Sequence, residues 1–192
     1  MRPLAKTDPD TTMLPPLTLI LGGARSGKSA YGEGLLEAAP GACVYLATAA
    51  AGDDEMTERI ALHRARRGTR WRTVEEPLAL TATLADAAGP DRAVLVDCLT
   101  LWLSNLLLAE RNPEVETSTL TAALPTLAGP VALIANEVGL GIVPENRLAR
   151  RFRDAAGRLN QAVAAAADRV VLVTAGLPLI LKDETPEGPS PS

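Results

Sequence analysis

Five short runs of the chain are continuously or almost continuously apolar, without the regular alternation of polar residues that marks a strand with one solvent-exposed face. Strands buried on both faces have this composition, and parallel sheets covered by helices bury their strands in this way. The runs cover residues 17–21, 43–47, 93–97, 131–135 and 170–174. We therefore predict five strands that form a mostly parallel sheet.

Helical segments are predicted between these runs, and this alternation is typical of an α/β domain. They cover residues 29–39, 53–67, 78–87, 99–110, 120–127 and 145–168, with a charged loop at 111–117. A length of 192 residues fits one domain, which we place at 17–182. Residues 1–16 and 183–192 are rich in proline and turn-forming residues, so we expect a flexible leader and a flexible tail.

The composition excludes several classes of function. A net charge of −4 and a pI of about 5.1 provide no basic field for nucleic acid, and 3% aromatic residues are too few for base stacking. No uncharged apolar run reaches the length of a membrane span, and the N-terminus lacks the apolar segment of a signal peptide. We expect a cytoplasmic protein that binds no nucleic acid, with Cys43 and Cys98 as buried, reduced thiols in two of the apolar runs.

A phosphate-binding loop follows the first apolar run. The sequence GGARSGKS at 22–29 fits the pattern G-x-x-x-x-G-K-[ST], with a predicted strand before it and a predicted helix after it. In such loops the backbone N–H groups surround phosphate oxygens, the lysine reaches the β- and γ-phosphates, and the hydroxyl binds Mg²⁺. We assign nucleotide binding to all of its residues: Gly22, Gly23, Ala24, Arg25, Ser26, Gly27, Lys28 and Ser29.

A carboxylate at the end of another strand is expected to complete the magnesium site with Ser29. Asp97 ends the run 93–97, and ligands of parallel sheets gather at the carboxyl ends of strands. We predict that Asp97 holds Mg²⁺ directly or through water. The alternative is that Asp97 caps the helix that follows it.

His63, the single histidine, lies on the predicted helix 53–67. Arg59, Arg66 and Arg67 are four residues before it, three after it and four after it, so they share its side of the helix. Nearby positive charge keeps an imidazole neutral, and a neutral imidazole can attack phosphorus to form a covalent P–N bond. Spacing alone favours the other interpretation, a solvated basic face that carries an incidental histidine.

Other polar segments are weaker candidates. Glu75 and Glu76 could bind a guanine edge or a metal, or could form an exposed acidic turn. Asn136 and Glu137 end the fourth apolar run, at the edge of the sheet that carries the phosphate loop. The arginine-rich helix 145–160 could be a solvated face or could meet an anionic substrate.

Several segments, in this order, resemble the bifunctional adenosylcobinamide kinase / adenosylcobinamide-phosphate guanylyltransferase family of cobalamin biosynthesis. They are GGARSGKS, VYLATA, DDEMTERIALHR, WRTVEEP, VLVDCLTLWLSNLL and NEVGLGIVPENRLARRFRDAAGRLNQ. The last segment is far more specific than the phosphate loop, and the resemblance extends from Leu17 to about Lys182. It implies a P-loop α/β fold similar to RecA-like ATPases, and a homotrimer.

The resemblance also implies two reactions. In the first reaction, ATP or GTP phosphorylates adenosylcobinamide. In the second, GTP donates GMP to adenosylcobinamide phosphate, which releases pyrophosphate and gives adenosylcobinamide-GDP. The GMP passes through a guanylylated histidine, which corresponds to His63. Mg²⁺ is the expected cofactor. Further positions that match nucleotide-binding segments of the family are Ala49, Ala50, Ala51, Arg64, Ala65, Arg66, Arg67, Glu75 and Asp97.

Two other hypotheses remain open from the sequence. The chain could be a P-loop kinase of small molecules in which His63 is a bystander, or a nucleotide-dependent switch or assembly module without catalysis. The segment Ala49–Gly52 has only small side chains, so contacts to the base from it would come from the backbone. The general base of the kinase step is not identified, and Glu137 is the candidate.

Overall fold

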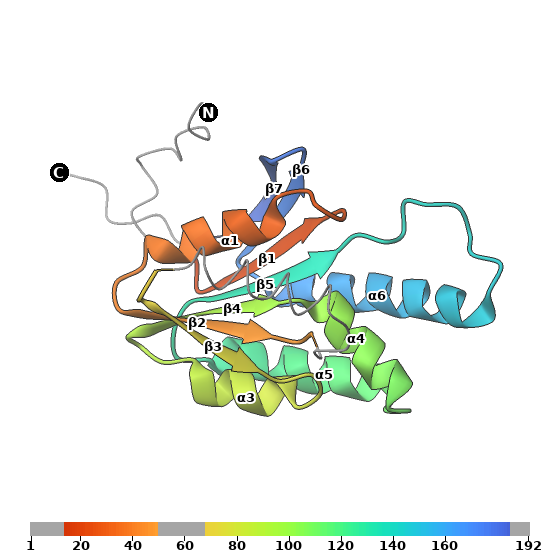
Figure 1. Ribbon diagram of the computed structural model, residues 1–192, viewed down its shortest axis with the longest axis horizontal. Helices are drawn as coiled ribbons and strands as arrows, with labels where there is room; N and C mark the ends of the chain where they lie inside the picture. The colour runs from red at the N-terminus through yellow and green to blue at the C-terminus, as the bar shows by residue number, and fades with distance from the viewer. Residues whose placement is uncertain (1–13, 50–67, 185–192) are drawn as a thin grey trace.

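The computed structural model describes residues 14–49 and 68–184, and its centre is a seven-stranded sheet (Figure 1). The strand order is β3-β2-β4-β5-β1-β6-β7, with every pair parallel except β6 and β7. The strands are β1 Leu17–Gly22, β2 Ala42–Ala47, β3 Trp71–Glu75, β4 Arg92–Asp97, β5 Val131–Asn136, β6 Arg169–Thr174 and β7 Leu177–Asp183. The predicted mostly parallel α/β fold is confirmed.

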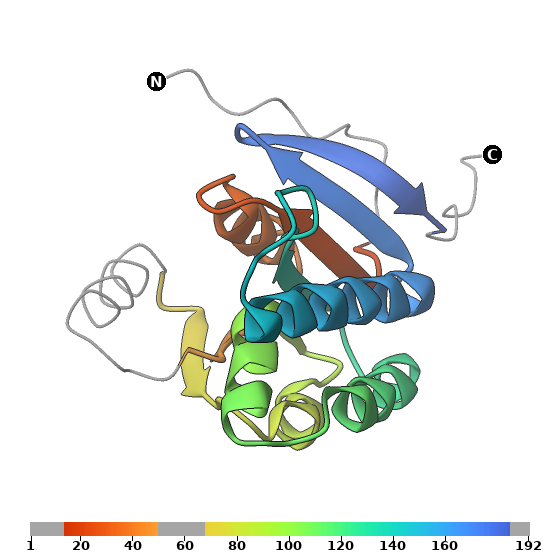
Figure 2. The same ribbon diagram turned by 90° about the vertical axis from the view of Figure 1, so that its right-hand side faces the viewer.

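Helices cover both faces of this sheet, with α1 on one face and the other helices on the opposite face (Figures 1 and 2). They are α1 Lys28–Glu37, α3 Leu80–Ala87, α4 Leu99–Leu108, α5 Pro113–Ala123 with a 3₁₀ turn at Leu124–Thr126, and α6 Arg147–Ala166. Successive side chains of a strand point to opposite faces. Leu19 accordingly packs in the core under α4 and α6, whereas Ile20 packs in the core under α1. This is why the central strands are mainly apolar on both faces.

The parallel register brings the carboxyl ends of the strands to one edge. Gly22 at the end of β1 is paired with Asn136 of β5 and with Val173 of β6. Ala47 at the end of β2 is paired with Asp97 of β4. Residues that follow these strands therefore meet at the same edge, although they lie far apart in the sequence.

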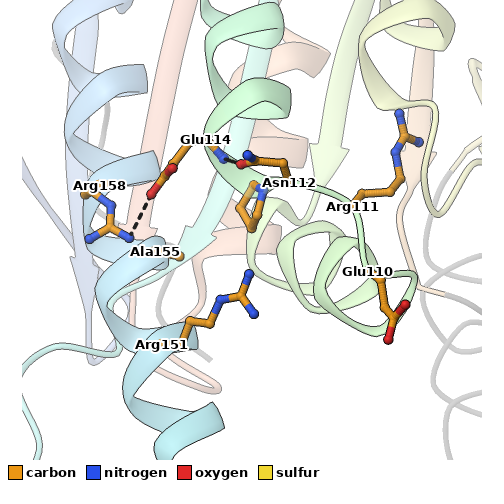
Figure 3. A pocket seen from close by; sticks show the side chains of 8 residues that line it. Glu110, Arg111, Asn112, Glu114, Arg151, Ala155 and Arg158 are labelled. Carbon is orange, nitrogen blue, oxygen red and sulfur yellow. Dashed lines mark hydrogen bonds and ion pairs between the residues drawn. The ribbon is translucent and has the colours of Figure 1, made fainter.

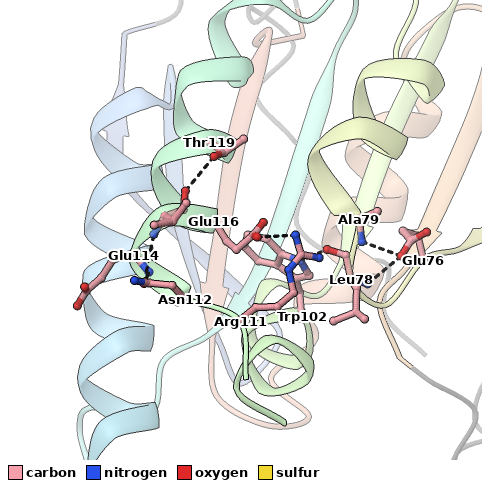
Figure 4. Close-up of polar contacts among 10 residues, drawn as sticks. Glu76, Leu78, Ala79, Trp102, Arg111, Asn112, Glu114, Glu116 and Thr119 are labelled. Atoms are coloured by element: carbon pink, nitrogen blue, oxygen red, sulfur yellow. Dashed lines mark hydrogen bonds and ion pairs between the residues drawn. The ribbon is translucent and has the colours of Figure 1, made fainter. Parts of the chain in front are cut away.

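The structure corrects three parts of the sequence-based assignment. Strands β3 and β7 were not predicted; both are partly or largely exposed, so they lack the apolar run that marks the buried strands. Helix α5 begins at Pro113, not at residue 120, so the loop predicted at 111–117 is wrong. The Asn112 side chain accepts hydrogen bonds from the backbone N–H groups of Glu114 and Val115, and this cap starts the helix early (Figure 4). The predicted helix 53–67 lies outside the described residues.

Both cysteines are buried, free thiols. Cys43 lies in β2, whereas Cys98 follows β4 and is the N-cap residue of α4, one position beyond the strand predicted for it. Burial, with a smaller effect from the Asp97 carboxylate, raises the pKa of the Cys98 thiol to about 11. Within residues 14–49 and 68–184, no helix is long and apolar enough to cross a membrane.

Trp102 is the largest fully buried side chain, and replacing it should strongly destabilise the fold. Its indole N–H donates a 3.0 Å hydrogen bond to the carbonyl oxygen of Leu78, in the turn whose N–H groups are bound by Glu76 (Figure 4). Trp102→Ala is expected to lower the free energy of unfolding by about 3–5 kcal/mol, measured by urea denaturation. The control Leu108→Ala changes a residue of the same helix that is 76% exposed, and it should change stability little. Equal losses in the two variants would contradict the assigned core.

Candidate nucleotide-binding site

The phosphate loop connects the end of β1 to the start of α1. Two of its residues, Arg25 (φ 54°) and Gly27 (φ 99°), have left-handed backbone conformations, which the tight turn requires. Lys28 is buried, and its ammonium group donates a 2.9 Å hydrogen bond to the carbonyl oxygen of Gly23. The ammonium group therefore contacts the backbone at the beginning of the loop.

The turn between β6 and β7 supports this loop. The Gly176 N–H donates a 2.9 Å hydrogen bond to the carbonyl oxygen of Ser26. A Cβ atom on Gly22 would lie 2.5 Å from both the Ser26 hydroxyl oxygen and the Val173 carbonyl oxygen. The absence of a side chain at Gly22 thus lets the loop pack directly against β6.

Asp97 lies beside Ser29, as predicted. Its Oδ2 atom accepts a 2.8 Å hydrogen bond from the Ser29 hydroxyl and another of 2.8 Å from the Tyr45 hydroxyl. Asp97 does not cap α4, because Cys98 is the N-cap residue and no side chain caps that helix. Sequence reasoning missed Tyr45, because it lies within an apolar strand and no local motif links its hydroxyl to Asp97.

The Ser29–Asp97 pair has the donor chemistry that Mg²⁺ prefers. Since the Ser29 hydroxyl donates its hydrogen bond to Asp97, the lone pairs of the hydroxyl oxygen are available to a cation, and the Asp97 carboxylate adds a negative charge beside it. No group of three or more histidine, cysteine or acidic residues could hold a metal in the described part of the chain. Mg²⁺ usually keeps several waters and binds phosphates together with one or two protein ligands, so this small donor set fits it.

Thr48 fixes the end of β2 against the end of β4. Its hydroxyl donates a 2.7 Å hydrogen bond to the carbonyl oxygen of Cys98 and accepts one of 2.9 Å from the Cys98 N–H. Ala49, predicted to line the nucleotide, follows directly and is half-buried. The predicted site residues that lie outside the described residues are Ala50, Ala51, His63, Arg64, Ala65, Arg66 and Arg67.

The two acidic candidates at the end of β3, Glu75 and Glu76, have different surroundings. Glu75 ends β3 in register with Ala47, at the edge that carries Asp97, and is exposed. Glu76 instead accepts hydrogen bonds of 2.8 and 2.7 Å from the N–H groups of Leu78 and Ala79 (Figure 4). Glu76 therefore holds the turn that leads into α3, whose N-cap residue is Ala79, while Glu75 stays a prediction for the nucleotide site.

Asn136 and Glu137 lie at the edge beside the phosphate loop. The Glu137 N–H donates a 3.2 Å hydrogen bond to the carbonyl oxygen of Gly22. The Glu137 carboxylate accepts a hydrogen bond from the N–H of Gly139, so it holds its own loop. The buried Oδ1 atom of Asn136 has no hydrogen-bond partner among the described residues.

The arginines of α6 mostly bind neighbouring groups of the protein. Arg150 holds the carbonyl oxygens of Pro144 and Glu145, Arg153 pairs with Asp154, and Arg158 lies 3.5 Å from Glu114. Arg151 and Arg158 also line a hollow of about 210 Å³ against the turn between α4 and α5 (Figure 3). Acidic and basic side chains alternate around this hollow, which contains no residue of the phosphate loop; its residues are Glu110, Arg111, Asn112, Pro113, Glu114, Arg151, Ala155 and Arg158.

Comparison with known proteins decides the family. The family model described as cobinamide kinase / cobinamide phosphate guanyltransferase matches residues 18–181. The chain belongs to this family. The resemblance seen in the sequence is therefore confirmed, and it includes both the phosphate loop and the segment that begins at Asn136.

Relatives of this cobinamide kinase / guanyltransferase family align over nearly their full length. The chain is 54% identical over 168 residues to the bifunctional adenosylcobalamin biosynthesis protein CobP of Pseudomonas aeruginosa, covering 86% of this chain and 97% of that protein. It is 44% identical over 181 residues to the protein CobU of Salmonella typhimurium, covering 86% of this chain and 99% of that protein.

Solved structures with similar folds are much more distant in sequence. An ATPase from a bacterial type III secretion system has a TM-score of 0.51 and 13% identity, covering 83% of this chain and 51% of that chain. A protein from Pyrococcus horikoshii, PH0250, has a TM-score of 0.50 and 9% identity, covering 88% of this chain and 86% of that one. At these identities the likeness concerns the fold alone.

The packing of the phosphate loop predicts a difference between its first two glycines. Gly22→Ala should lower the free energy of unfolding by about 1–3 kcal/mol, because the added methyl group would overlap backbone of β6. Gly23→Ala is the matched control, since a Cβ atom there meets nothing within 4 Å. Urea denaturation without nucleotide measures both, and a Gly22→Ala variant as stable as the control would show that the loop does not pack as described.

Proposed function

We propose that this protein phosphorylates adenosylcobinamide with ATP or GTP and then transfers GMP from GTP to adenosylcobinamide phosphate. Membership of the cobinamide kinase / cobinamide phosphate guanyltransferase family supports the pair of reactions. The observation that carries the proposal is the contact between Ser29 and Asp97 beside Lys28, since it assembles the groups that handle a magnesium-bound triphosphate.

In the kinase step, the hydroxyl group of the aminopropanol arm attacks the γ-phosphorus of the triphosphate. The O–P bond to the nucleoside diphosphate breaks, and the hydroxyl proton passes to a base. Lys28 and the loop N–H groups stabilise the charge that develops on the phosphate oxygens. Mg²⁺, held by Ser29 with Asp97, would neutralise part of the same charge. Glu137, beside Gly22, is the candidate base.

In the guanylyltransferase step, a neutral ring nitrogen of His63 attacks the α-phosphorus of GTP and pyrophosphate leaves. The acceptor phosphate oxygen then attacks the same phosphorus, the P–N bond breaks, and adenosylcobinamide-GDP forms. The cationic neighbours expected from helical spacing, Arg59, Arg66 and Arg67, keep the imidazole unprotonated and attract phosphate. A covalent intermediate lets the two large substrates use the site in turn.

Covalent labelling tests the histidine. The protein is incubated with GTP labelled at the α-phosphate and Mg²⁺, without corrinoid, and is then denatured. We expect an acid-labile, base-stable label in the wild type and none in His63→Ala, which should still phosphorylate adenosylcobinamide. A wild type that takes up no label would leave a P-loop kinase with His63 as a bystander, which is the alternative function.

The proposed binding of Mg²⁺ by Ser29 and Asp97 predicts how a substitution of Asp97 changes the kinase rate and its dependence on Mg²⁺. Asp97→Asn keeps an acceptor for Ser29 and Tyr45 but removes the negative charge, so the kinase rate should fall by about 10²-fold or more. A titration of Mg²⁺ should show a higher half-saturating concentration in this variant. Asp86→Asn, an exposed acidic residue on α3, is the control for loss of one charge. Equal Mg²⁺ dependence in both variants would remove Asp97 from the proposed site.

The homotrimer implied by the family resemblance is also part of this proposal. Sedimentation velocity of the full chain measures it directly. A mass near three times 20.1 kDa is the expected result. A monomer that performs both reactions would contradict it.

A further inference from the structure

We propose that an apolar rim beside the phosphate loop binds the corrin macrocycle of the acceptor substrate. The rim consists of Leu140, Ile142 and Val143, in the loop between β5 and α6, and of Leu177 at the start of β7. The inference rests on the proposed function, because it assigns a surface to the acceptor of that reaction.

The rim side chains are exposed to an extent that is unusual for large apolar residues. Leu140 is 90% exposed and Ile142 is 97% exposed, while Val143 and Leu177 are 60% and 62% exposed. Single exposed apolar residues are ordinary on protein surfaces, whereas a group of them at one place marks a binding surface. These four belong to two segments that meet the same loop.

The strand order places the two segments on either side of the phosphate loop. Strand β1, which leads into that loop, lies between β5 and β6. The segment after β5 begins with the hydrogen bond from the Glu137 N–H to the Gly22 carbonyl oxygen, and the turn after β6 begins with that from the Gly176 N–H to the Ser26 carbonyl oxygen. The segment after β5 projects beyond the carboxyl ends of the strands (Figure 1), and the view from that side shows it next to the phosphate loop (Figure 2).

Polar contacts hold the apolar loop in this exposed position. At its beginning, the Glu137 carboxylate accepts a hydrogen bond from the Gly139 N–H. At its end, Asn146 caps α6 by accepting from the N–H of Leu148 at 2.7 Å, and Arg150 donates a 2.9 Å hydrogen bond to the Pro144 carbonyl oxygen. The loop is therefore fixed by its ends, while the side chains between them remain free to contact a ligand.

The chemistry of the rim fits the acceptor better than the nucleotide. Phosphates are held by N–H groups and cations, which the phosphate loop supplies, and apolar side chains add nothing to this. The nucleoside contacts that we predict follow β2 and β3, beyond β4 and β5 from the phosphate loop. The reacting hydroxyl must come within about 3–3.5 Å of phosphorus, so the bulk of the acceptor has to lie on the surface next to the loop. A corrin ring has broad apolar faces that match an open apolar rim.

Binding measurements on the full chain test the rim. Equilibrium dialysis with cobinamide, followed by its visible absorbance, is done with Mg²⁺ and a non-hydrolysable GTP analogue present. The double variant L140S/I142S and the single variant Leu177→Ser remove apolar groups from the two sides of the phosphate loop. The control L108S/V115S removes two apolar side chains that are 76% and 58% exposed on α4 and α5. Circular dichroism establishes that each variant is folded.

We expect each rim variant to weaken cobinamide binding, by tenfold or more for L140S/I142S, with the affinity for the GTP analogue within twofold of wild type and with the control unchanged. Unchanged cobinamide binding in folded rim variants would overturn the inference. A parallel loss of nucleotide affinity would also overturn it, since the rim would then belong to the nucleotide site. So would a change of sedimenting mass with unchanged cobinamide binding, which would assign the rim to contacts between copies. A wild type that binds the nucleotide but phosphorylates no cobinamide would instead refute the proposed function.

Discussion

The placement of β1 between two parallel neighbours is the constraint on which the site depends. Because β5 and β6 pair with β1 in register, the segments that follow all three strands come out at one edge. The phosphate loop follows β1, a polar and apolar loop follows β5, and a supporting turn follows β6. This edge thus brings together groups that can bind a phosphate and, by our inference, a surface that binds a large apolar acceptor. Catalysis of phosphoryl transfer consists mainly of such positioning.

The buried strands could be predicted because a strand that is buried on both faces has a continuous apolar sequence. Each of β1, β2, β4, β5 and β6 coincides with an apolar run to within a residue or two. The edge strands β3 and β7 are partly or largely exposed, so their sequences lack a continuous apolar run. They form by hydrogen bonding to the neighbouring strands β2 and β6. The loop predicted at 111–117 rests on the charge of that segment, whereas Asn112 and Pro113 form a favourable N-cap and first helical position, which start α5 there.

Site residues could be predicted from the sequence where they belong to a local motif, but not where only tertiary contacts bring them to the site. The phosphate loop is one continuous segment, and Asp97 could be placed beside Ser29 because parallel strands end at a common edge. Tyr45 could not be found, since only the pairing of β2 with β4 brings its hydroxyl to Asp97. The proposed role of His63 rests on the family resemblance alone, since the spacing of arginines around it in the sequence cannot distinguish a nucleophile from a solvated face.

We propose that GMP passes through His63 on its way from GTP to adenosylcobinamide phosphate. The most direct measurement is a chase. Protein carrying labelled GMP is freed of GTP and Mg²⁺ by gel filtration, and adenosylcobinamide phosphate is then added with fresh Mg²⁺. We predict that label leaves the protein and appears in adenosylcobinamide-GDP in equal amount, without added GTP. If the label stays on the protein and product forms only after GTP is supplied, GMP is transferred directly from GTP, and the proposed GMP–His63 intermediate is contradicted.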